Sequence, residues 1–391
     1  MIKDIALKFK NFVKPKVTSK FIDLSLDGSD NIVLNMSVID DDNNIIAVGY
    51  GISSDNYRYA LIIKLNDKLD MVGHSEIKVD RTDVVLSGIT FGHNGIYLCC
   101  GHYDSKAYIA EFSVDLCLTR SYTYSSPHNT SSFSAIATDG NHNIICVGGV
   151  NNYGLVVQCN NGLHLVEHMV YASSKSDLTY FTDVVVSSSL HKTCVGWVCK
   201  FNEAAGGSTP VVVDFNKTSD TLPTCSSSER TIDQLHGSLL SVDKYHRSYV
   251  AVGWYRDDDK FHPLVTSFDI GDGKPNTAPV IHRNTAHVNN LILKSATVDR
   301  YGHIICVGDN NDVGALMIFD RDMTLVRNQY CRHDGGCTLN HVVTTTEDNH
   351  KSVQFTKGQA IICVGTVTID NKSKGLIVRY DEGDDRTTLS L

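Results

Sequence analysis

Cysteine and histidine side chains gather most closely in one short segment near the C-terminal end of the chain. Cys331, His333, Cys337 and His341 lie within it, and each of these side chains is a possible zinc ligand. The gaps between them are not the paired short gaps of structural zinc sites. We therefore expect a solvent loop flanked by strand cysteines, keep the four residues as a weak metal candidate, and expect no bound cofactor.

Acidic turns are the second group that could do chemistry. The runs at 40–42, 257–259 and 309–312 carry carboxylates that could bind calcium, but none has the spacing of an EF-hand loop. Asp and Asn favour tight turns because their side chains bond to their own backbone. Catalysis would need acids and bases such as His102, Arg256 and Asp309 to converge, and they lie in different parts of the chain. The sequence has no Gly-x-Ser-x-Gly elbow.

The segments that carry these residues repeat along the chain. An apolar run ends in Val-Gly or Cys-Gly, a polar loop follows, and a second apolar run closes on an apolar or aromatic residue. A period of roughly fifty residues indicates a solenoid or propeller. The step residues are Val48-Gly49, Cys100-Gly101, Val147-Gly148, Val195-Gly196, Val252-Gly253, Val307-Gly308 and Val364-Gly365, and the closing residues are Leu65, Phe112, Cys159, Phe215, Phe268, Phe319 and Tyr380.

Each repeat has room for four short antiparallel strands, which is one propeller blade. The sequence therefore predicts an all-β fold: a seven-bladed β-propeller of four-stranded antiparallel blades with a short N-terminal arm. We expect the arm at residues 1–20 and the propeller at 21–391, with a strand at 21–27 closing the ring beside the last blade. The expected blades are 30–79, 80–125, 126–172, 173–229, 230–284, 285–332 and 333–391.

In such a ring, the loops after the Val-Gly strands lie on the same face as the connections between blades. This face is the loop face. Binding residues are commonly carried by variable loops on a fixed scaffold. We expect binding through His102, Tyr103, Tyr153, Trp197, Trp254, Tyr255, Arg256 and Asp309.

The first twenty residues differ from the rest of the chain because they hold six lysines and one aspartate. Helical spacing would place Ile5, Phe9 and Phe12 on one face with lysines around it. We expect this arm to dock on a partner protein; the alternatives are an acidic membrane surface, which is less favoured, or an arm that folds on its own propeller or is frayed.

Composition limits the possible partners and the compartment. The net charge of −9 gives no basic field for nucleic acid, so nucleic acid is not an expected partner. No apolar run is long enough to cross a membrane, and no signal-peptide pattern is present. Several of the twelve cysteines occupy matching repeat positions, which would lie too far apart around a ring for disulfides. We therefore expect synthesis in a reducing cytoplasm.

The repeat lacks the Gly-His to Trp-Asp signature and the regular Gly-Gly pair of better-known propellers. With its loops rich in Asn, Asp, Ser and His and its cytosolic cysteines, the chain resembles degenerate seven-bladed propellers in the tails, baseplates and fibres of large tailed phages. The resemblance covers about residues 20–391 and carries over no functional residue.

The resemblance implies a non-enzymatic structural or adhesion module that is incorporated into a virion. Its partners would be other structural subunits, bound through the arm, and a protein receptor or surface glycan, bound through the loop face. The alternatives are a propeller enzyme, a hydrolase or lyase with its site at the channel mouth, and an intracellular platform for protein interactions.

Overall fold

The computed structural model describes residues 16–22, 31–125, 130–172, 178–188, 191–199, 208–217, 225–231, 236–245, 248–257, 260–269, 280–282, 290–299, 301–310, 312–345 and 360–381. Residues 1–15, which include Ile5, Phe9 and Phe12, lie outside this part of the chain, as does the run 387–391.

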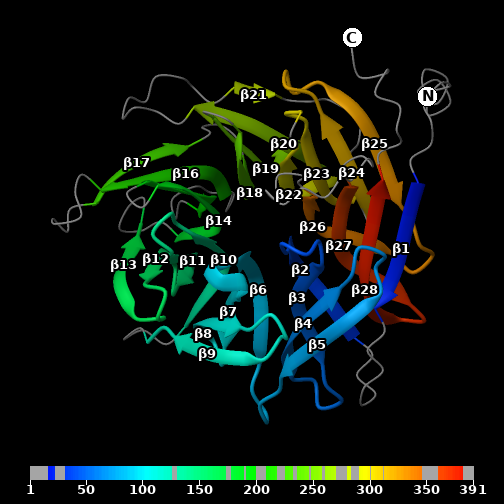
Figure 1. The fold of residues 1–391 in the computed structure, drawn as a ribbon. Helices are drawn as coiled ribbons and strands as arrows, with labels where there is room; N and C mark the ends of the chain where they lie inside the picture. Colours follow the sequence, from blue (N-terminus) through cyan, green and yellow to red (C-terminus); the bar gives the residue numbers. More distant parts are fainter. Residues whose placement is uncertain are drawn as a thin grey trace.

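Seven four-stranded antiparallel sheets are arranged as blades around a central channel (Figure 1). Blade one is β2 (Asn31–Ile39), β3 (Ile45–Ile52), β4 (Arg58–Leu65) and β5 (Met71–Ile77); blade two is β6 (Val84–Phe91), β7 (Tyr97–Tyr103), β8 (Lys106–Phe112) and β9 (Leu118–Thr123). Blade three is β10 (Ser131–Thr138), β11 (Ile144–Val150), β12 (Tyr153–Cys159) and β13 (Leu165–Tyr171); blade four is β14 (Leu178–Ser188), β15 (His191–Cys199), β16 (Ser208–Lys217) and β17 (Cys225–Thr231). The expected all-β propeller is confirmed.

Blade five is β18 (His236–Tyr245), β19 (Ser248–Asp257), β20 (Lys260–Asp269) and β21 (Val280–His282); blade six is β22 (Leu291–Val298), β23 (Ile304–Asn310), β24 (Val313–Phe319) and β25 (Leu325–Cys331). Blade seven is β26 (Cys337–Thr344), β27 (Ala360–Ile369) and β28 (Lys372–Asp381), completed by β1 (Lys16–Ile22). One short 3₁₀ helix, η1 (His93–Gly95), interrupts the strands of the described part.

Closure of the ring joins the two ends of the described chain. β1 pairs antiparallel with β28, so that Lys16 lies opposite Asp381 and Ile22 opposite Gly375. The closing strand thus begins at Lys16 rather than at 21, and the boundary expected at residue 20 falls inside β1. Similarly, the blade boundary expected at 229 falls inside β17.

The two central strands of a blade are buried along nearly their whole length because both faces of the sheet pack against neighbouring blades. β11 is buried at every residue, and β3 at its first five. Such strands have near-continuous apolar sequences, like strands covered on both faces in other folds. The buried runs seen in the sequence as Ile-Ile-Ala-Val-Gly or Ile-Ile-Cys-Val-Gly are these second strands.

Each inner strand contains a bulge beside the repeated glycine, and β14 has a second register shift between Val186 and Ser188. In blade one the register shifts between Leu34 and Met36, and Gly49 pairs with Leu34. A Cβ on Gly49 would lie 1.9 Å from the Val33 carbonyl oxygen, which no side chain can occupy. The same approach, at 1.8 to 2.1 Å, recurs at the other six repeat positions: Gly101, Gly148, Gly196, Gly253, Gly308 and Gly365.

In several blades a small residue at the start of the third strand makes room for the next blade, whereas blades four and five have Pro210 and Pro263 at this position. Gly154 lies against the ring of Phe181, Gly314 against Leu339, and Gly375 against Leu34. These three large residues stand just before the bulge of the following inner strand and are fully buried. The contact explains why a small residue precedes the second apolar run of a repeat.

Candidate functional site

The loop face is held together by backbone hydrogen bonds between the loops of one blade and the connections to the next. The Asp104 amide donates to the Asp83 carbonyl oxygen at 3.0 Å, and the Asn151 amide donates to that of Thr130 at 3.0 Å. In the same way, the Thr179 amide donates to Asn152 at 2.9 Å. The loops are therefore braced, and side chains on them are carried by a rigid support.

Aromatic side chains of blades three to five lie on this face. Trp197 stacks on Tyr180, with ring centroids 6.0 Å apart, and Trp254 meets Phe261 edge to face at 5.1 Å. Both tryptophans are half-buried, whereas Tyr153 is 38% exposed. These three predicted binding residues thus stand at the loop-face ends of their strands, each beside partners from its own blade.

Arg256 is exposed at the end of β19, but its neighbour Tyr255 does not contribute to the surface. Tyr255 is 6% exposed and stacks on His262 at 5.2 Å, in the core between blades. Its prediction as a binding residue is therefore corrected. Successive strand residues point to opposite sides, so the residue next to Trp254 turns inward.

His102 and Tyr103 close β7 on the same face. Both are half-buried, and the Tyr103 ring lies 5.7 Å from that of Tyr108. Burial lowers the pKa of His102, and the Arg58 charge lowers it further, while Asp83 opposes the shift. The imidazole is therefore held toward its neutral form.

Asp309 takes part in a cluster that crosses from blade six to blade seven and on to blade one. Its carboxylate lies 2.5 Å from the Lys294 ammonium, which also donates to the Asn340 side chain at 3.1 Å. The Asn340 amide in turn donates to the Leu34 carbonyl oxygen at 2.8 Å. The cluster links three blades at the channel.

Lys294 and Asn340 are themselves bulge residues of inner strands, and most other bulges also carry polar side chains. Asn35 donates to the Leu86 carbonyl oxygen at 2.8 Å, and Thr182 donates to that of Leu239 at 2.7 Å. The bulge residues in chain order are Asn35, Ser87, Ser134, Thr182, Leu240, Lys294 and Asn340. The sequence did not reveal these residues, because a bulge position has no characteristic residue type.

In five blades the residue after the bulge also reaches the next blade, where its side chain accepts a backbone N–H; blades two and three have Gly88 and Ala135 at this position. Asp183 accepts from Val242 at 2.9 Å, and the His341 Nδ1 accepts from Ser37 at 3.3 Å. Burial lowers the pKa of His341 to about 4, so the ring is a neutral acceptor. Burial raises the pKa of Asp183 to about 6, although backbone donors and Ser241 oppose the shift.

The weak metal candidate is not assembled. Cys331 and Cys337 are adjacent, with their sulfurs 3.0 Å apart, but His341 faces Ser37 of blade one. His333 accepts from the Gly335 amide at 3.3 Å in its own loop. Within the described ranges, no group of three or more His, Cys, Asp or Glu side chains could hold a metal ion.

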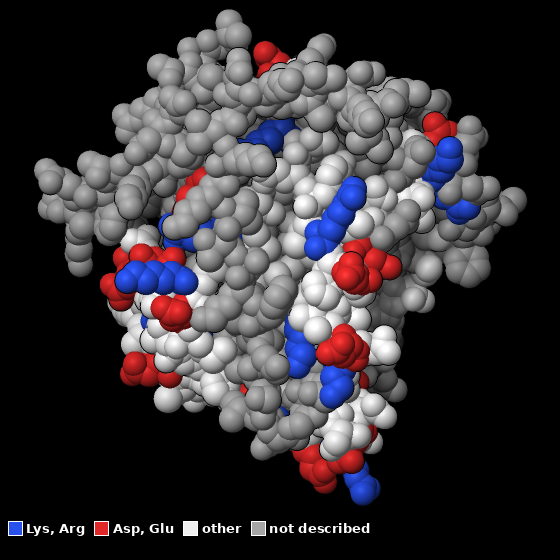
Figure 2. Space-filling view, turned by 90° about the vertical axis from the view of Figure 1, so that its right-hand side faces the viewer, with Lys and Arg blue, Asp and Glu red and all other residues white. Residues whose placement is uncertain are grey.

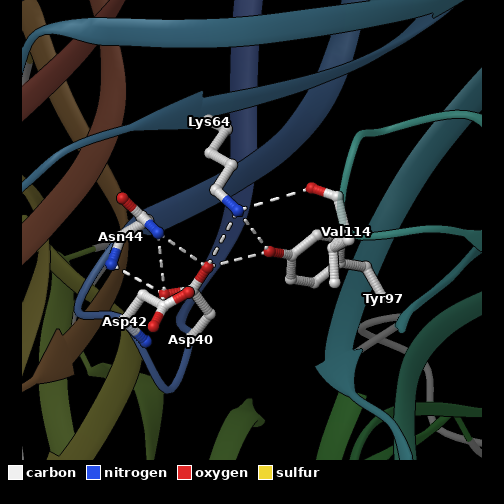
Figure 3. A network of polar contacts seen from close by, with 6 residues as sticks. All are labelled: Asp40, Asp42, Asn44, Lys64, Tyr97 and Val114. Atoms are coloured by element: carbon white, nitrogen blue, oxygen red, sulfur yellow. Dashed lines mark hydrogen bonds and ion pairs between the residues drawn. The ribbon is translucent and has the colours of Figure 1, made fainter. Parts of the chain in front are cut away.

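On the opposite face, Lys64, Asp40 and Tyr97 form a polar network between blades one and two (Figure 3). Lys64 lies 3.1 Å from the Asp40 carboxylate and 3.0 Å from the Tyr97 hydroxyl, which donates to Asp40 at 2.9 Å. Asp40 also accepts the backbone N–H groups of Asp42 and Asn44, which makes its acidic run an Asx turn. This agrees with the turn interpretation of that run.

Electrostatics in this network favour the ion pair. Burial opposes both charges, yet hydrogen bonds outweigh it, so that the pKa of Asp40 is lowered and that of Lys64 is raised. Burial raises the pKa of Tyr97 to about 12, and its bond to Asp40 adds to the effect while Lys64 opposes it. The three groups satisfy one another, which suits a fixed contact between blades better than proton transfer.

The same kind of contact recurs around that face. Lys64 donates to the carbonyl oxygen of Val114 in the next blade at 3.4 Å, and Arg120 donates to that of Asn161 at 2.9 Å. Arg379 of blade seven donates to Asp67 of blade one at 2.5 Å. Because these cations end on neighbouring loops, they clasp one blade to the next.

The rim of the molecule carries charges of both signs. Figure 2 shows described Lys and Arg close to described Asp and Glu on the side where blades seven and one meet. Two ion pairs lie within these blades: Arg379 with Asp381 in blade seven and Lys78 with Glu76 in blade one, both at 2.7 Å. No helix of the described chain is long and apolar enough to span a membrane.

Comparison with known proteins bears on the fold. No protein-family model matches the chain, and no curated protein matches its sequence. Among solved structures it is similar to Drosophila Plexin A in complex with Semaphorin 1b, with 10% identity, 94% of this chain and 87% of that chain covered, and a TM-score of 0.55. At that identity the likeness concerns the fold alone.

Two further solved structures are similar at lower scores. A luciferin-regenerating enzyme is 10% identical, the match covers 94% of this chain and 96% of the enzyme chain, and the TM-score is 0.44. The AfRom2 CNH domain is also 10% identical, the match covers 94% of this chain and 100% of that domain, and the TM-score is 0.47. The fold and the described site define the chain as a seven-bladed β-propeller.

Proposed function

We propose that this propeller is a non-catalytic binding module whose loop face docks on a partner protein. The observation that carries the proposal is the set of exposed aromatic and arginine side chains on that face. Tyr57 and Tyr153 are 37% and 38% exposed, and Arg256 is exposed beside the half-buried Trp254. Tyrosine, tryptophan and arginine are the residues that contribute most to protein interfaces.

The polar groups near the channel support a binding role over a catalytic one. Asp309 faces Lys294, Asn340 donates to a backbone oxygen, and His341 accepts a backbone N–H. The Asn340 and His341 contacts hold blade seven against blade one, and the Asp309 contact joins two strands of blade six. A hydrolase or lyase would need such groups to converge on a substrate instead.

A second contact is assigned to residues 1–15, the part of the arm that precedes β1. An apolar face of Ile5, Phe9 and Phe12 calls for a covering surface, and we place that surface on a neighbouring subunit. The pairing of β1 with β28 supports this arrangement, because an arm that starts beside Lys16 is anchored directly to the closed ring. Membership of a virus particle stays a prediction from the sequence, as does the binding of a glycan.

A protein partner is in keeping with the propeller that is similar in fold, since Drosophila Plexin A is in complex with Semaphorin 1b. This propeller would likewise hold a protein partner on a rigid scaffold. Its loops are braced by backbone bonds such as that from Thr368 to Gly336, at 3.0 Å, so little order would have to be gained on binding.

The test is hydroxyl-radical footprinting of the full chain, alone and in the assembly isolated from the cells that produce it. Three tyrosines are matched in exposure: Tyr57 at 37% and Tyr153 at 38% on the loop face, and Tyr301 at 41% in the turn between β22 and β23 on the opposite face. We expect Tyr57 and Tyr153 to be protected in the assembly and Tyr301 to react as in the isolated chain.

Protection of Tyr301 with unchanged Tyr57 and Tyr153 would place the partner on the wrong face and refute the proposal. Equal reactivity of all three residues in the assembly would refute it as well. A paired variant, Tyr153→Ala with Arg256→Ala, is expected to reduce the share of chain recovered in the assembly by at least about tenfold, since two interface anchors cost about 2 kcal/mol or more. Tyr301→Ala is the control.

A further inference from the structure

Cys331 and Cys337 stand at the two ends of the connection from blade six to blade seven. Cys331 is the last residue of β25, and Cys337 is the first residue of β26. Their sulfur atoms are 3.0 Å apart, and both cysteines are free. Cys337 is buried, while Cys331 is half-buried and open to a small reagent. A pair of thiols in this position needs little movement to form a bond of about 2 Å.

The surrounding backbone holds the pair in place. Cys331 lies opposite Gly314 in the ladder of β24 and β25, and the Cys337 amide donates to the Asp312 carbonyl oxygen at 2.5 Å. Gly314 leaves the space that the sulfurs occupy, because a Cβ there would lie 3.1 Å from the Cys337 sulfur. Within the connection, the Gly336 amide donates to His333 at 2.9 Å.

We propose that Cys331 and Cys337 are a reversible redox pair, which a small-molecule disulfide such as glutathione disulfide converts into an intramolecular disulfide. The proposal is independent of the binding role assigned to the loop face. It replaces the zinc interpretation of the same segment, because the two cysteines meet each other and His341 faces another blade.

The two thiols are unequal, which sets the order of the steps. The Cys337 thiol donates its hydrogen bond to the Cys331 sulfur, and this lowers the pKa of Cys331 although burial opposes the shift. The pKa of Cys337 is raised, first by holding its proton in that bond and then by burial. Cys331 is thus the attacking thiolate.

In the first step the Cys331 thiolate attacks one sulfur of glutathione disulfide. A mixed disulfide forms on Cys331, and one glutathione thiolate leaves. In the second step Cys337 loses its proton and its sulfur attacks Cys331, which displaces the second glutathione. Two protein thiols are oxidised, one glutathione disulfide is reduced to two glutathione molecules, and excess reduced glutathione reverses both steps.

The bond would join the outer strand of blade six to the inner strand of blade seven. Blade seven is also the blade that β1 completes. The connection lies on the loop face, where the Thr368 amide of blade seven donates to Gly336. Oxidation would therefore fix the boundary between these two blades and restrain one sector of the loop face.

Other described cysteines lack this combination. Cys100 and Cys146 lie in the same core cluster of blades two and three but are fully buried. Cys117 is exposed, and its thiol contacts the carbonyl oxygen of Asp115 at 4.0 Å. Cys117 is therefore the matched control: a reagent reaches it, but it has no resolving thiol in this contact.

The experiment treats the folded full-length chain with glutathione disulfide, blocks remaining thiols, and digests the denatured protein with trypsin without reduction. Trypsin cleaves after Arg327, Arg332 and Lys351, so the two cysteines fall in separate peptides, 328–332 and 333–351. We expect these peptides to be recovered linked, two hydrogens lighter than their sum, and separate after dithiothreitol. The link should form at least about ten times faster than an adduct on Cys117.

Two variants complete the test. Cys337→Ser should trap glutathione on Cys331, and Cys331→Ser should abolish the link and leave Cys337 unmodified in the folded protein. The proposal is overturned if peptides 328–332 and 333–351 stay unlinked in the wild type while Cys117 reacts. It is equally overturned if wild-type Cys331 accumulates as the glutathione adduct, because Cys337 then does not resolve it.

Discussion

The repeated glycine of each blade is set by one atom, the carbonyl oxygen beside the bulge of the inner strand. At Gly308 a Cβ would lie 1.8 Å from the Ile292 oxygen, and at Gly49 it would lie 1.9 Å from that of Val33. Real Cβ atoms do not approach so closely. The residue of the second strand that lies beside the bulge must therefore lack a side chain. This explains why every repeat has glycine at that position.

Substituting alanine at Gly49 should therefore destabilise the propeller. The backbone of Val33 and Leu34 would have to move away, and such overpacking costs about 3 kcal/mol. The measurement is the urea midpoint of unfolding. Gly140→Ala is the control, because a Cβ at Gly140 meets nothing within 4 Å; its effect should stay within about 0.5 kcal/mol. Equal effects of the two substitutions would contradict the explanation.

For single residues, the sequence predicted the position along a strand better than the direction in which the side chain points. The Val-Gly steps and the closing residues occupy equivalent places in all blades, because each faces the same packing environment, and Phe112, Phe319 and Leu65 are fully buried. Tyr255 could not be placed correctly, since the side to which it points depends on the neighbouring blade. The link between Cys331 and Cys337 was hidden because it depends on the path of the connection.

Inner strands of adjacent blades contact each other through side-chain acceptors as well as apolar packing. The oxygen of Asp183 on β14 accepts the Val242 amide of β18, and that of Asp243 on β18 accepts the Val298 amide of β22. β18 and β22 are edge strands of their sheets, so these acceptors satisfy amides on their unpaired edges. Sequence reasoning could not find them, because methionine, aspartate, serine and histidine all serve in this position.

Asp183 gives this contact a pH dependence. Burial raises its pKa from 3.8 to about 6, so the folded state keeps a proton that the unfolded chain releases between these values. Its contribution to the free energy of unfolding is full below pH 3.8 and is lost as the pH rises to 6, by about 3 kcal/mol. Asp183→Asn should therefore gain stability relative to the wild type between pH 4 and pH 7.

Urea unfolding of both proteins at several pH values measures that difference. Asp55→Asn, at an exposed acid in the loop between β3 and β4, is the control and should follow the wild-type profile. A constant difference between wild type and Asp183→Asn across the range would show that Asp183 is ionised throughout. The explanation given for its pKa would then be wrong.

The closing strand is an element that the sequence placed only approximately. The sequence predicted a closing strand at 21–27, yet the strand that pairs with β28 is Lys16–Ile22. Strand pairing uses backbone groups, so side-chain alternation fixes which face is buried but not where pairing starts. As a result, residues 16–20, expected in the arm, belong to the propeller.

Two deletions separate the arm from the closing strand. Removal of residues 1–15 keeps β1 whole and should leave the urea midpoint unchanged while reducing recovery in the assembly. Removal of residues 1–22 takes away the fourth strand of blade seven and exposes the edge of β28; we expect a loss of several kcal/mol. If the shorter deletion is recovered in the assembly as well as the full chain, the arm is not the attachment point.

Over the whole molecule, the fold could be predicted because seven imperfect copies average out local ambiguity. No single repeat specifies a blade, but the glycine step and the closing residue recur in the same order in all seven copies, with loops of different lengths between them. Function has no such redundancy: the loop face differs from blade to blade, and residues such as Trp197 and Trp254 belong to two blades alone. The binding role that we propose for this face therefore depends on the exposure and contacts of individual side chains, which are known only from the structure.

Pairing of β1 with β28 also orders events during translation. Lys16 and Ile22 are synthesised before their partners Asp381 and Gly375, which follow more than 350 residues later for the first pair and more than 340 for the second. At about 5 to 20 residues per second, β1 waits roughly 20 to 70 s for β28. Blades one to six can form in that interval on the nascent chain, but blade seven cannot be completed. Of the described strands, the first to be made is thus the last to pair, and until then β1 lacks its partner and is open to a chaperone or to a second nascent chain.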